Sequence, residues 1–201
     1  AAALSYVRAP EDVLIYHHSI GCTSGVDTMQ AARCRKVVKY HNVTPPEFFA
    51  GISEAHQQLC ESGRAQLKDI VAAQPHLYLA ASEFNSLDLI AAGSEKDQTF
   101  VVPPFNQADG LRAGEADLEL FDSYHDESVN LLTVGGVRPN KGHGDLIEAF
   151  AIYYYNFNAQ ARLFIVGSAN NAFEPYAAAL RRLIDEWSIG SRVVITRRSS
   201  R

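Results

Sequence analysis

Three kinds of pattern are scarce in this sequence, and each scarcity argues against a class of protein. The only cysteines are Cys22, Cys34 and Cys60, which are widely spaced with no C-x-x-C, so neither a disulfide framework nor a zinc site is indicated. The formal net charge is -5 and no run of basic residues occurs, which argues against a nucleic-acid-binding surface. No apolar stretch reaches the ~18 residues needed to span a bilayer.

A secretion signal is lacking as well. The N-terminal AAALSYVRAPEDV has neither the basic head nor the long apolar core of a signal peptide, so we interpret the sequon Asn42-Val43-Thr44 as accidental. A reducing, cytoplasmic compartment is the expectation. The hydrophobic content of 47% and the charged content of 20% are typical of a globular protein with a sizeable core.

Short β-type segments alternate with longer helical patterns along the chain. Strands are predicted at 12–19, 35–41, 76–82, 98–104, 129–136, 161–167 and 191–196. Helices are predicted at about 24–33, 52–73, 83–92, 145–155 and 175–187, with Gly63 as a candidate interruption of the second one. This alternation predicts an α/β fold whose parallel sheets are covered by helices.

A polar, acidic segment without sustained periodicity, residues 106–127, divides the alternation into two parts. We predict a linker or excursion there, between a Rossmann-like lobe at 1–105 and a second one at 128–201. The stretch VVPPF at 101–105 is the expected crossing point between the lobes. In open α/β sheets ligands bind beyond the carboxyl ends of the strands, so function is expected at those ends.

Histidines gather at the predicted strand ends of the first part. His17 and His18 end the first strand and His41 ends the second. Histidine suits acid–base or sugar-hydroxyl contacts because its ordinary pKa of about 6.5 leaves both proton states accessible near neutrality. A structural role remains the alternative for each of them. A metal site is not expected, because no carboxylate or second histidine stands at ligand spacing on the same element.

In the second part, the segment VGGVRPNKGHGDLIEAF passes from a strand through a charged loop into an amphipathic helix. Gly135 and Gly136 end the strand, and Arg138 and Lys141 lie in the loop. Free backbone N–H groups at a helix start form an anion site, to which Lys141 adds a charge. The loop matches neither G-x-G-x-x-G nor G-x-x-x-x-G-K-[ST], so a phosphate site and a solvated turn both remain open on this pattern alone.

A family resemblance adds to this pattern. LLTVGGVRPNKGHGDLIEAF followed by ARLFIVGS resembles the start of the donor-binding lobe of family-four retaining glycosyltransferases, whose GT-B fold has two Rossmann-like lobes. DVLIYHHS, KYHNVTPPEFF, SEFNSLDL and VVPPF resemble the later acceptor lobe, in the right order. The resemblance implies a hexosyltransferase that moves a sugar from a UDP-, GDP- or ADP-sugar with retention, usually without a metal and with no cofactor beyond that co-substrate.

The resemblance also implies roles for individual residues. Lys141 matches the lysine that neutralises the donor diphosphate, and His17 or His18 matches a histidine that approaches the transferred sugar. The family places an arginine where this chain has Gly136, and Arg138 is the expected substitute. The implied donor-binding set is Gly135, Gly136, Arg138, Lys141, Gly167 and Ser168.

Segments that the family has before and after this stretch are not matched, so both lobes are expected to be incomplete and the chain by itself inactive. The basic ending RRSSR does not resemble the family's continuation. The expected partners are a nucleotide-sugar donor and a glycan or lipid-linked acceptor in polysaccharide biosynthesis, with any peripheral membrane contact made by unmatched segments. Two alternatives stay open: a nucleotide-sugar epimerase of the same fold, and a non-catalytic α/β module.

Overall fold

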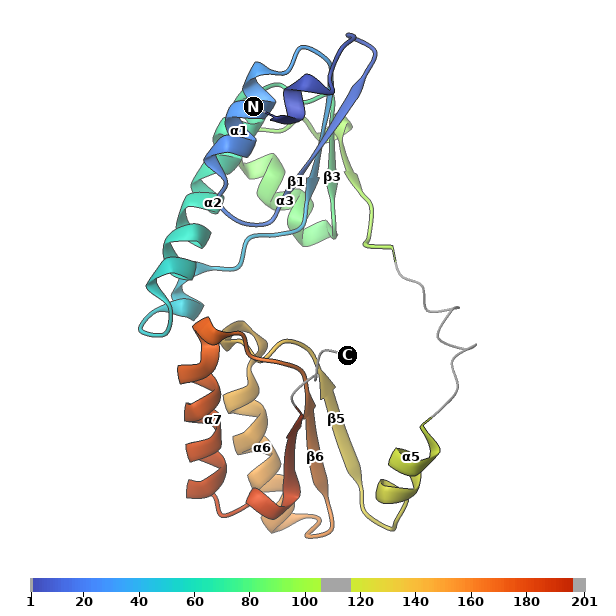
Figure 1. Ribbon diagram of the computed structural model, residues 1–201, viewed down its shortest axis with the longest axis vertical. Helices are drawn as coiled ribbons and strands as arrows, with labels where there is room; N and C mark the ends of the chain where they lie inside the picture. The colour runs from blue at the N-terminus through green and yellow to red at the C-terminus, as the bar shows by residue number, and fades with distance from the viewer. Residues whose placement is uncertain (1, 106–116, 197–201) are drawn as a thin grey trace. The chain divides into compact units, whose positions relative to one another are not determined.

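The computed structural model describes residues 2–105 and 117–196, and these form two compact units. The first unit holds residues 2–50 and 54–105, and the second holds residues 51–53 and 117–196. In Figure 1 the first unit runs from blue to green and the second from yellow to red. None of the helices in the described ranges is both long enough and apolar enough to cross a membrane.

The first unit is built on a four-stranded parallel sheet with strand order β1-β2-β3-β4. The strands are β1 (Val13–His18), β2 (Arg35–Tyr40), β3 (Leu77–Ala80) and β4 (Thr99–Val101). The α-helices are α1 (Thr23–Ala31), α2 (Glu54–Ala72) and α3 (Glu83–Ala91), with short 3-10 helices η1 (Ala2–Ser5), η2 (Pro46–Phe49) and η3 (Lys96–Gln98). The predicted alternation and the parallel pairing are confirmed for this unit.

Successive residues of a strand point to opposite faces of the sheet, and in this unit the core lies on one of the two faces. On β1, His18 is fully buried, whereas Val13 and Ile15 on the other face are 55% and 53% exposed. The hydroxyl of buried Tyr40 donates to Asp88 of α3, 3.1 Å away. The helices therefore pack on the face that holds His18 and Tyr40, and His17 belongs to the opposite face.

Helix α2 runs without a break through Gly63, so the predicted interruption is wrong. Gly63 instead allows the loop after β1 to approach the helix closely. A Cβ at Gly63 would lie 2.6 Å from the backbone nitrogen of Gly21, and that nitrogen donates to the Leu59 carbonyl at 2.9 Å. The loop after β1 therefore lies directly on the middle of α2, at a place where no side chain fits.

The second unit is a three-stranded parallel sheet of order β5-β6-β7. Its strands are β5 (Asn130–Val134), β6 (Arg162–Val166) and β7 (Val193–Thr196). Its helices are α5 (Leu118–Tyr124), α6 (His143–Asn156) and α7 (Glu174–Glu186), with 3-10 helices η4 (Pro139–Lys141), η5 (Asn171–Phe173) and η6 (Gly190–Arg192). This second predicted β/α alternation is confirmed as well, and Figure 1 shows α6 and α7 on one side of the strands.

The core of the second unit lies between its sheet and the helices α6 and α7. Leu163 and Ile165 of β6 are buried there together with Ile147 and Phe150 of α6. On the opposite face Leu132 of β5 is 66% exposed. Along β6, buried Leu163 and Ile165 alternate with partly exposed residues, because successive side chains of a strand point to opposite faces of the sheet.

Part of the predicted linker is helical. The segment 118–124 forms α5, because Asp117 accepts a hydrogen bond from the Leu120 amide at 3.0 Å and so caps the helix start. The predicted linker or excursion therefore contains a short helix that its lack of periodicity did not indicate. The remainder of the predicted linker at 106–116 lies outside the described residues.

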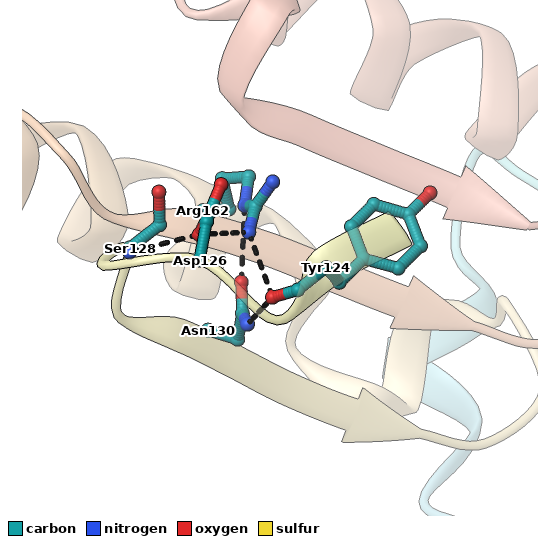
Figure 2. Close-up of polar contacts among 5 residues, drawn as sticks. All are labelled: Tyr124, Asp126, Ser128, Asn130 and Arg162. Atoms are coloured by element: carbon teal, nitrogen blue, oxygen red, sulfur yellow. Dashed lines mark hydrogen bonds and ion pairs between the residues drawn. The ribbon is translucent and has the colours of Figure 1, made fainter. Parts of the chain in front are cut away.

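Figure 2 shows how the chain after α5 is fixed to β6. Arg162 forms an ion pair with Asp126 at 2.7 Å, donates to the Tyr124 carbonyl at 3.1 Å and donates to the Asn130 side chain at 3.0 Å. The Ser128 amide donates to the same carboxylate oxygen at 2.9 Å. The Tyr124 ring also meets Phe164 edge-on, with centroids 4.7 Å apart. One arginine thus holds α5 on the face of the sheet opposite α6 and α7.

Candidate functional site

A charged loop follows β5 and leads directly into α6. Pro139 cannot extend a strand ladder, so the chain turns through η4, and Gly142 takes the left-handed conformation with φ 66° just before the helix. Arg138 and Lys141 are both exposed in this loop. Two cations therefore lie at the carboxyl end of β5, next to the N-terminus of a 14-residue helix.

The side chain of Arg138 lies over the backbone of Gly136. A Cβ built at Gly136 would be 3.4 Å from Nε of Arg138, and the guanidinium carbon is 5.6 Å from the centre of the Phe173 ring. A Cβ at position 136 would thus be in ordinary contact with the Arg138 side chain, which lies directly beside the start of any side chain at that position. The geometry is compatible with the expectation that Arg138 substitutes for an arginine at position 136.

The hydroxyl group of Tyr176, from α7, lies beside the start of α6. Burial raises the pKa of the Tyr176 phenol, while the backbone N–H groups of Gly144 and His143, which hydrogen-bond its oxygen, lower it. The Tyr176 hydroxyl therefore lies beside two of the amides that could hold an anion at this helix start. Tyr176 comes from α7 and was not singled out from the sequence, because nothing local marks a tyrosine within a helix as a partner for a distant helix start.

His143, the first residue of α6, is 1% exposed and supports the loop from inside. Burial lowers its pKa, a hydrogen bond to the backbone of Arg138 raises it, and the charge of Lys141 lowers it. Its Nδ1 has no hydrogen-bond partner among the described residues. His143 therefore fixes the backbone from which the Arg138 side chain extends.

Gly135, which follows β5, and Gly167, which follows β6, lie against each other. The Gly135 amide donates to the Val166 carbonyl at 2.9 Å, and the Val137 amide donates to the Ser168 carbonyl at 3.1 Å, so the pairing of β5 and β6 continues into their loops. A Cβ at Gly167 would lie only 1.8 Å from the Gly135 carbonyl oxygen. The structure thus brings together Gly135 and Gly167, which are far apart in the sequence.

Gly167 and Ser168 also line a hollow of about 250 Å³ at the carboxyl end of β6 and β7. Its other lining residues are Val137, Ala169, Asn171, Glu174, Ala177, Arg181, Ile195 and Thr196. Arg181 and Glu174 form an ion pair there at 2.9 Å. The hollow adjoins the loop that carries the cations, on the side of β6.

In the first unit the structure separates the two candidate histidines. His18 is fully buried, and its Nε2 donates to the Gly63 carbonyl at 2.8 Å. Burial lowers the pKa of His18, against that hydrogen bond, which raises it. His17 is exposed on the opposite face, where its Nδ1 is 2.8 Å from Nε2 of His41. Of the two, His17 is the histidine that a ligand can reach.

Comparisons with known proteins find solved structures with a similar fold, but no similar sequence family. No protein-family model matches the sequence, and no curated protein matches it. Sucrose-phosphate synthase from Thermosynechococcus elongatus matches 99% of this chain at 18% identity and a TM-score of 0.71. HepE of Anabaena in complex with UDP and glucose matches 87% at 18% identity and a TM-score of 0.58. A glycosyltransferase from Rickettsia africae ESF-5 matches 92% at 14% identity and a TM-score of 0.62.

At these identities the likeness establishes the fold. The chain is α/β with two parallel sheets of the Rossmann-like kind found in GT-B glycosyltransferases, as the sequence predicted. The chain spans less than half the length of these solved proteins, at 48%, 45% and 47% respectively.

Proposed function

We propose that this chain is part of a glycosyltransferase that moves a hexose from a nucleoside diphosphate sugar to a glycan or glycolipid acceptor, with retention of anomeric configuration. One observation carries the proposal: the second unit holds Arg138 and Lys141 exposed at the carboxyl end of β5, beside the start of α6. The solved structures of HepE with UDP and with UDP-glucose support a nucleotide-sugar donor. A cytoplasmic location belongs to the same proposal.

In this reaction the bond between the anomeric carbon and the diphosphate oxygen breaks, and a bond to the acceptor hydroxyl oxygen forms. The diphosphate leaves with the electron pair, and the acceptor hydroxyl releases its proton. Negative charge therefore grows on the diphosphate as the bond breaks. Lys141 and Arg138 supply fixed positive charge at the place where it is most useful in the transition state. We expect turnover without added divalent metal for the same reason.

A second candidate is a module that keeps the fold without the chemistry. The observation that favours it is the Tyr176 hydroxyl, because it faces the N–H groups of His143 and Gly144 that an anion would otherwise use. In that case the loop cations would remain solvated charges. Binding of a nucleotide at the loop separates the two candidates.

The test is a calorimetric titration of the chain with UDP and UDP-glucose at low and high salt. We expect weak binding that declines as salt rises, since Arg138 and Lys141 are exposed to solvent. Lys141→Ala should weaken UDP binding about tenfold, through loss of one charge-assisted contact. Lys68→Ala is the matched control, because Lys68 is an exposed lysine on α2 of the other unit.

Equal UDP affinity in Lys141→Ala and Lys68→Ala would remove the loop from the donor site. In an intact enzyme that contains this chain and transfers sugar, Lys141→Ala should lower kcat about 10²-fold, as the loss of one preorganised electrostatic contact does. No detectable binding of UDP at the loop would favour the module that keeps the fold without the chemistry.

A further inference from the structure

A pair of histidines stands at the carboxyl edge of the first sheet, on the face that no helix of this unit covers. His17 ends β1, and His41 follows β2 with its amide donating to the His18 carbonyl at 2.9 Å. The two rings are nearly parallel, with centroids 5.1 Å apart and an interplanar angle of 18°. Nδ1 of His17 and Nε2 of His41 share a hydrogen bond of 2.8 Å. Each ring therefore determines which nitrogen of the other carries a proton.

Burial and neighbouring charge both favour the neutral form of His41. Burial lowers the pKa of His41, and the neighbouring His17 and Lys39 lower it further. Lys39 is itself largely buried and donates from Nζ to the Val102 carbonyl, so its charge is held in place. A neutral imidazole has one N–H donor and one acceptor nitrogen. Only two arrangements of the shared bond are then possible when both rings are neutral.

The two arrangements differ in what His17 presents to solvent. If His41 donates from Nε2, both rings carry their proton on Nε2, and His17 presents an outward N–H group. If His17 donates from Nδ1, both rings carry it on Nδ1, and His17 presents a lone pair. A free neutral imidazole side chain prefers the proton on Nε2, the nitrogen further from the backbone. Both rings satisfy that preference only in the first arrangement.

We propose that His41 is a positioning residue: it donates its Nε2 hydrogen to Nδ1 of His17 and thereby fixes His17 as an outward N–H donor to a hydroxyl oxygen of a sugar. The carboxyl ends of parallel strands are where such folds bind ligands, and exposed His17 stands at one of them. The sugar contact rests on the proposed function, whereas the fixed tautomer does not. His41 touches no sugar in this arrangement.

Nitrogen-15 NMR of the histidine rings tests the tautomer on the chain as it is, without ligand. We expect His17 to be protonated on Nε2 and unprotonated on Nδ1. His41→Glu leaves only an acceptor opposite Nδ1, so His17 should shift its proton to Nδ1. His41→Leu removes the bond and should give a mixture of both forms. Buried His18 is the internal control, because its bond to Gly63 should be unchanged in every variant.

Protonation of His17 on Nδ1 in the unmodified chain would overturn the inference, and so would an unchanged tautomer in His41→Glu. The sugar contact is tested with UDP-glucose, with UDP as the control ligand. UDP-glucose should shift the ring signals of His17, whereas UDP should not. The amide signal of Lys141 reports separately on the proposed contact with the diphosphate. In His41→Glu the affinity for UDP-glucose should fall about tenfold while that for UDP stays the same.

The two proposals fail in different ways. A shift at Lys141 without one at His17 would leave the proposed function standing and overturn the sugar contact of His17. The absence of any shift at Lys141 would overturn the proposed function, while the ligand-free tautomer of His17 would still decide the role of His41.

Discussion

Replacing Gly167 with alanine tests how closely β5 and β6 must approach each other beyond their strand ends. The new Cβ would lie 1.8 Å from the Gly135 carbonyl oxygen and 2.8 Å from its carbonyl carbon. Both are backbone atoms, so no rotamer change relieves the contact. The two segments must separate by roughly 1 Å or more to reach ordinary contact, a forced backbone shift of the kind that overpacking causes.

That separation breaks specific hydrogen bonds. In the parent chain the Val137 amide donates to the Ser168 carbonyl at 3.1 Å, and this hydrogen bond would break in the variant. The hydrogen bond from the Gly135 amide to the Val166 carbonyl would lengthen. Strain of about 1–3 kcal/mol together with one or two weakened hydrogen bonds of about 1 kcal/mol each gives a loss of roughly 3 kcal/mol in the free energy of unfolding.

The assay is urea unfolding followed by tryptophan fluorescence. The chain has one tryptophan, Trp187, which follows α7 in the second unit, so the signal reports on that unit alone. Gly144→Ala is the matched control, because a Cβ there meets nothing within 4 Å. The control should match or slightly exceed the parent stability, since alanine favours a helix by about 0.5–1 kcal/mol over glycine. A stability of Gly167→Ala within about 0.5 kcal/mol of the parent would refute the reasoning, because that is the spread of neutral substitutions.

Three further predictions concern single side chains. Tyr176→Phe removes the hydroxyl that lies beside the amides of the α6 start, so we expect stability to fall by about 1 kcal/mol in urea and pyrophosphate binding to tighten in calorimetry; no change in either would contradict an interaction of this hydroxyl with the helix start. The Ser128 amide and then Arg162 lower the pKa of Asp126, so the contribution of Asp126 to the attachment of α5 should be complete above the ordinary value of 3.8 and lost as pH falls through the lowered pKa. NMR signals of α5 measure this, and Arg162→Gln should weaken the attachment already at neutral pH. Burial and then Asp88 raise the pKa of Tyr40 to about 12, so the stabilising effect of Tyr40 should be complete below the ordinary value of 10.0 and lost as pH rises through about 12. An ultraviolet titration should show one late-titrating tyrosine that is missing in Tyr40→Phe, and identical titrations of the two proteins would contradict this.

The secondary structure could be predicted because its signals are local. Each β-type segment and each helical pattern gave one element within a few residues of the observed bounds, and both parallel sheets followed from their alternation. Helix α5 was missed because its seven residues are too few for periodicity, and its attachment to β6 comes from Arg162, which is distant in the sequence. Gly63 was misjudged for a similar reason, since its partner Gly21 lies outside its helix.

The candidate site could be predicted only in part. The loop with Arg138 and Lys141 is contiguous in the sequence, so its charges and the helix start could be recognised from their order. His17 and His18 could not be told apart, because both faces of β1 carry apolar residues: Val13 and Ile15 on one, Leu14 and Tyr16 on the other. The position of the Tyr176 hydroxyl beside the α6 amides depends on the packing of α7 against α6, which no short segment encodes.

The contact between α2 and the end of β1 limits how the first unit can move. Three positions along α2 hold this region: the Leu59 carbonyl binds the Gly21 amide, the Gly63 carbonyl binds the His18 ring, and the Gln66 side chain binds the Cys22 amide at 2.9 Å. Sliding α2 by one turn, about 5.4 Å, would break all three at once. The helix and the strand end therefore behave as one rigid piece, and a push on α2 would move His17 with it rather than past it.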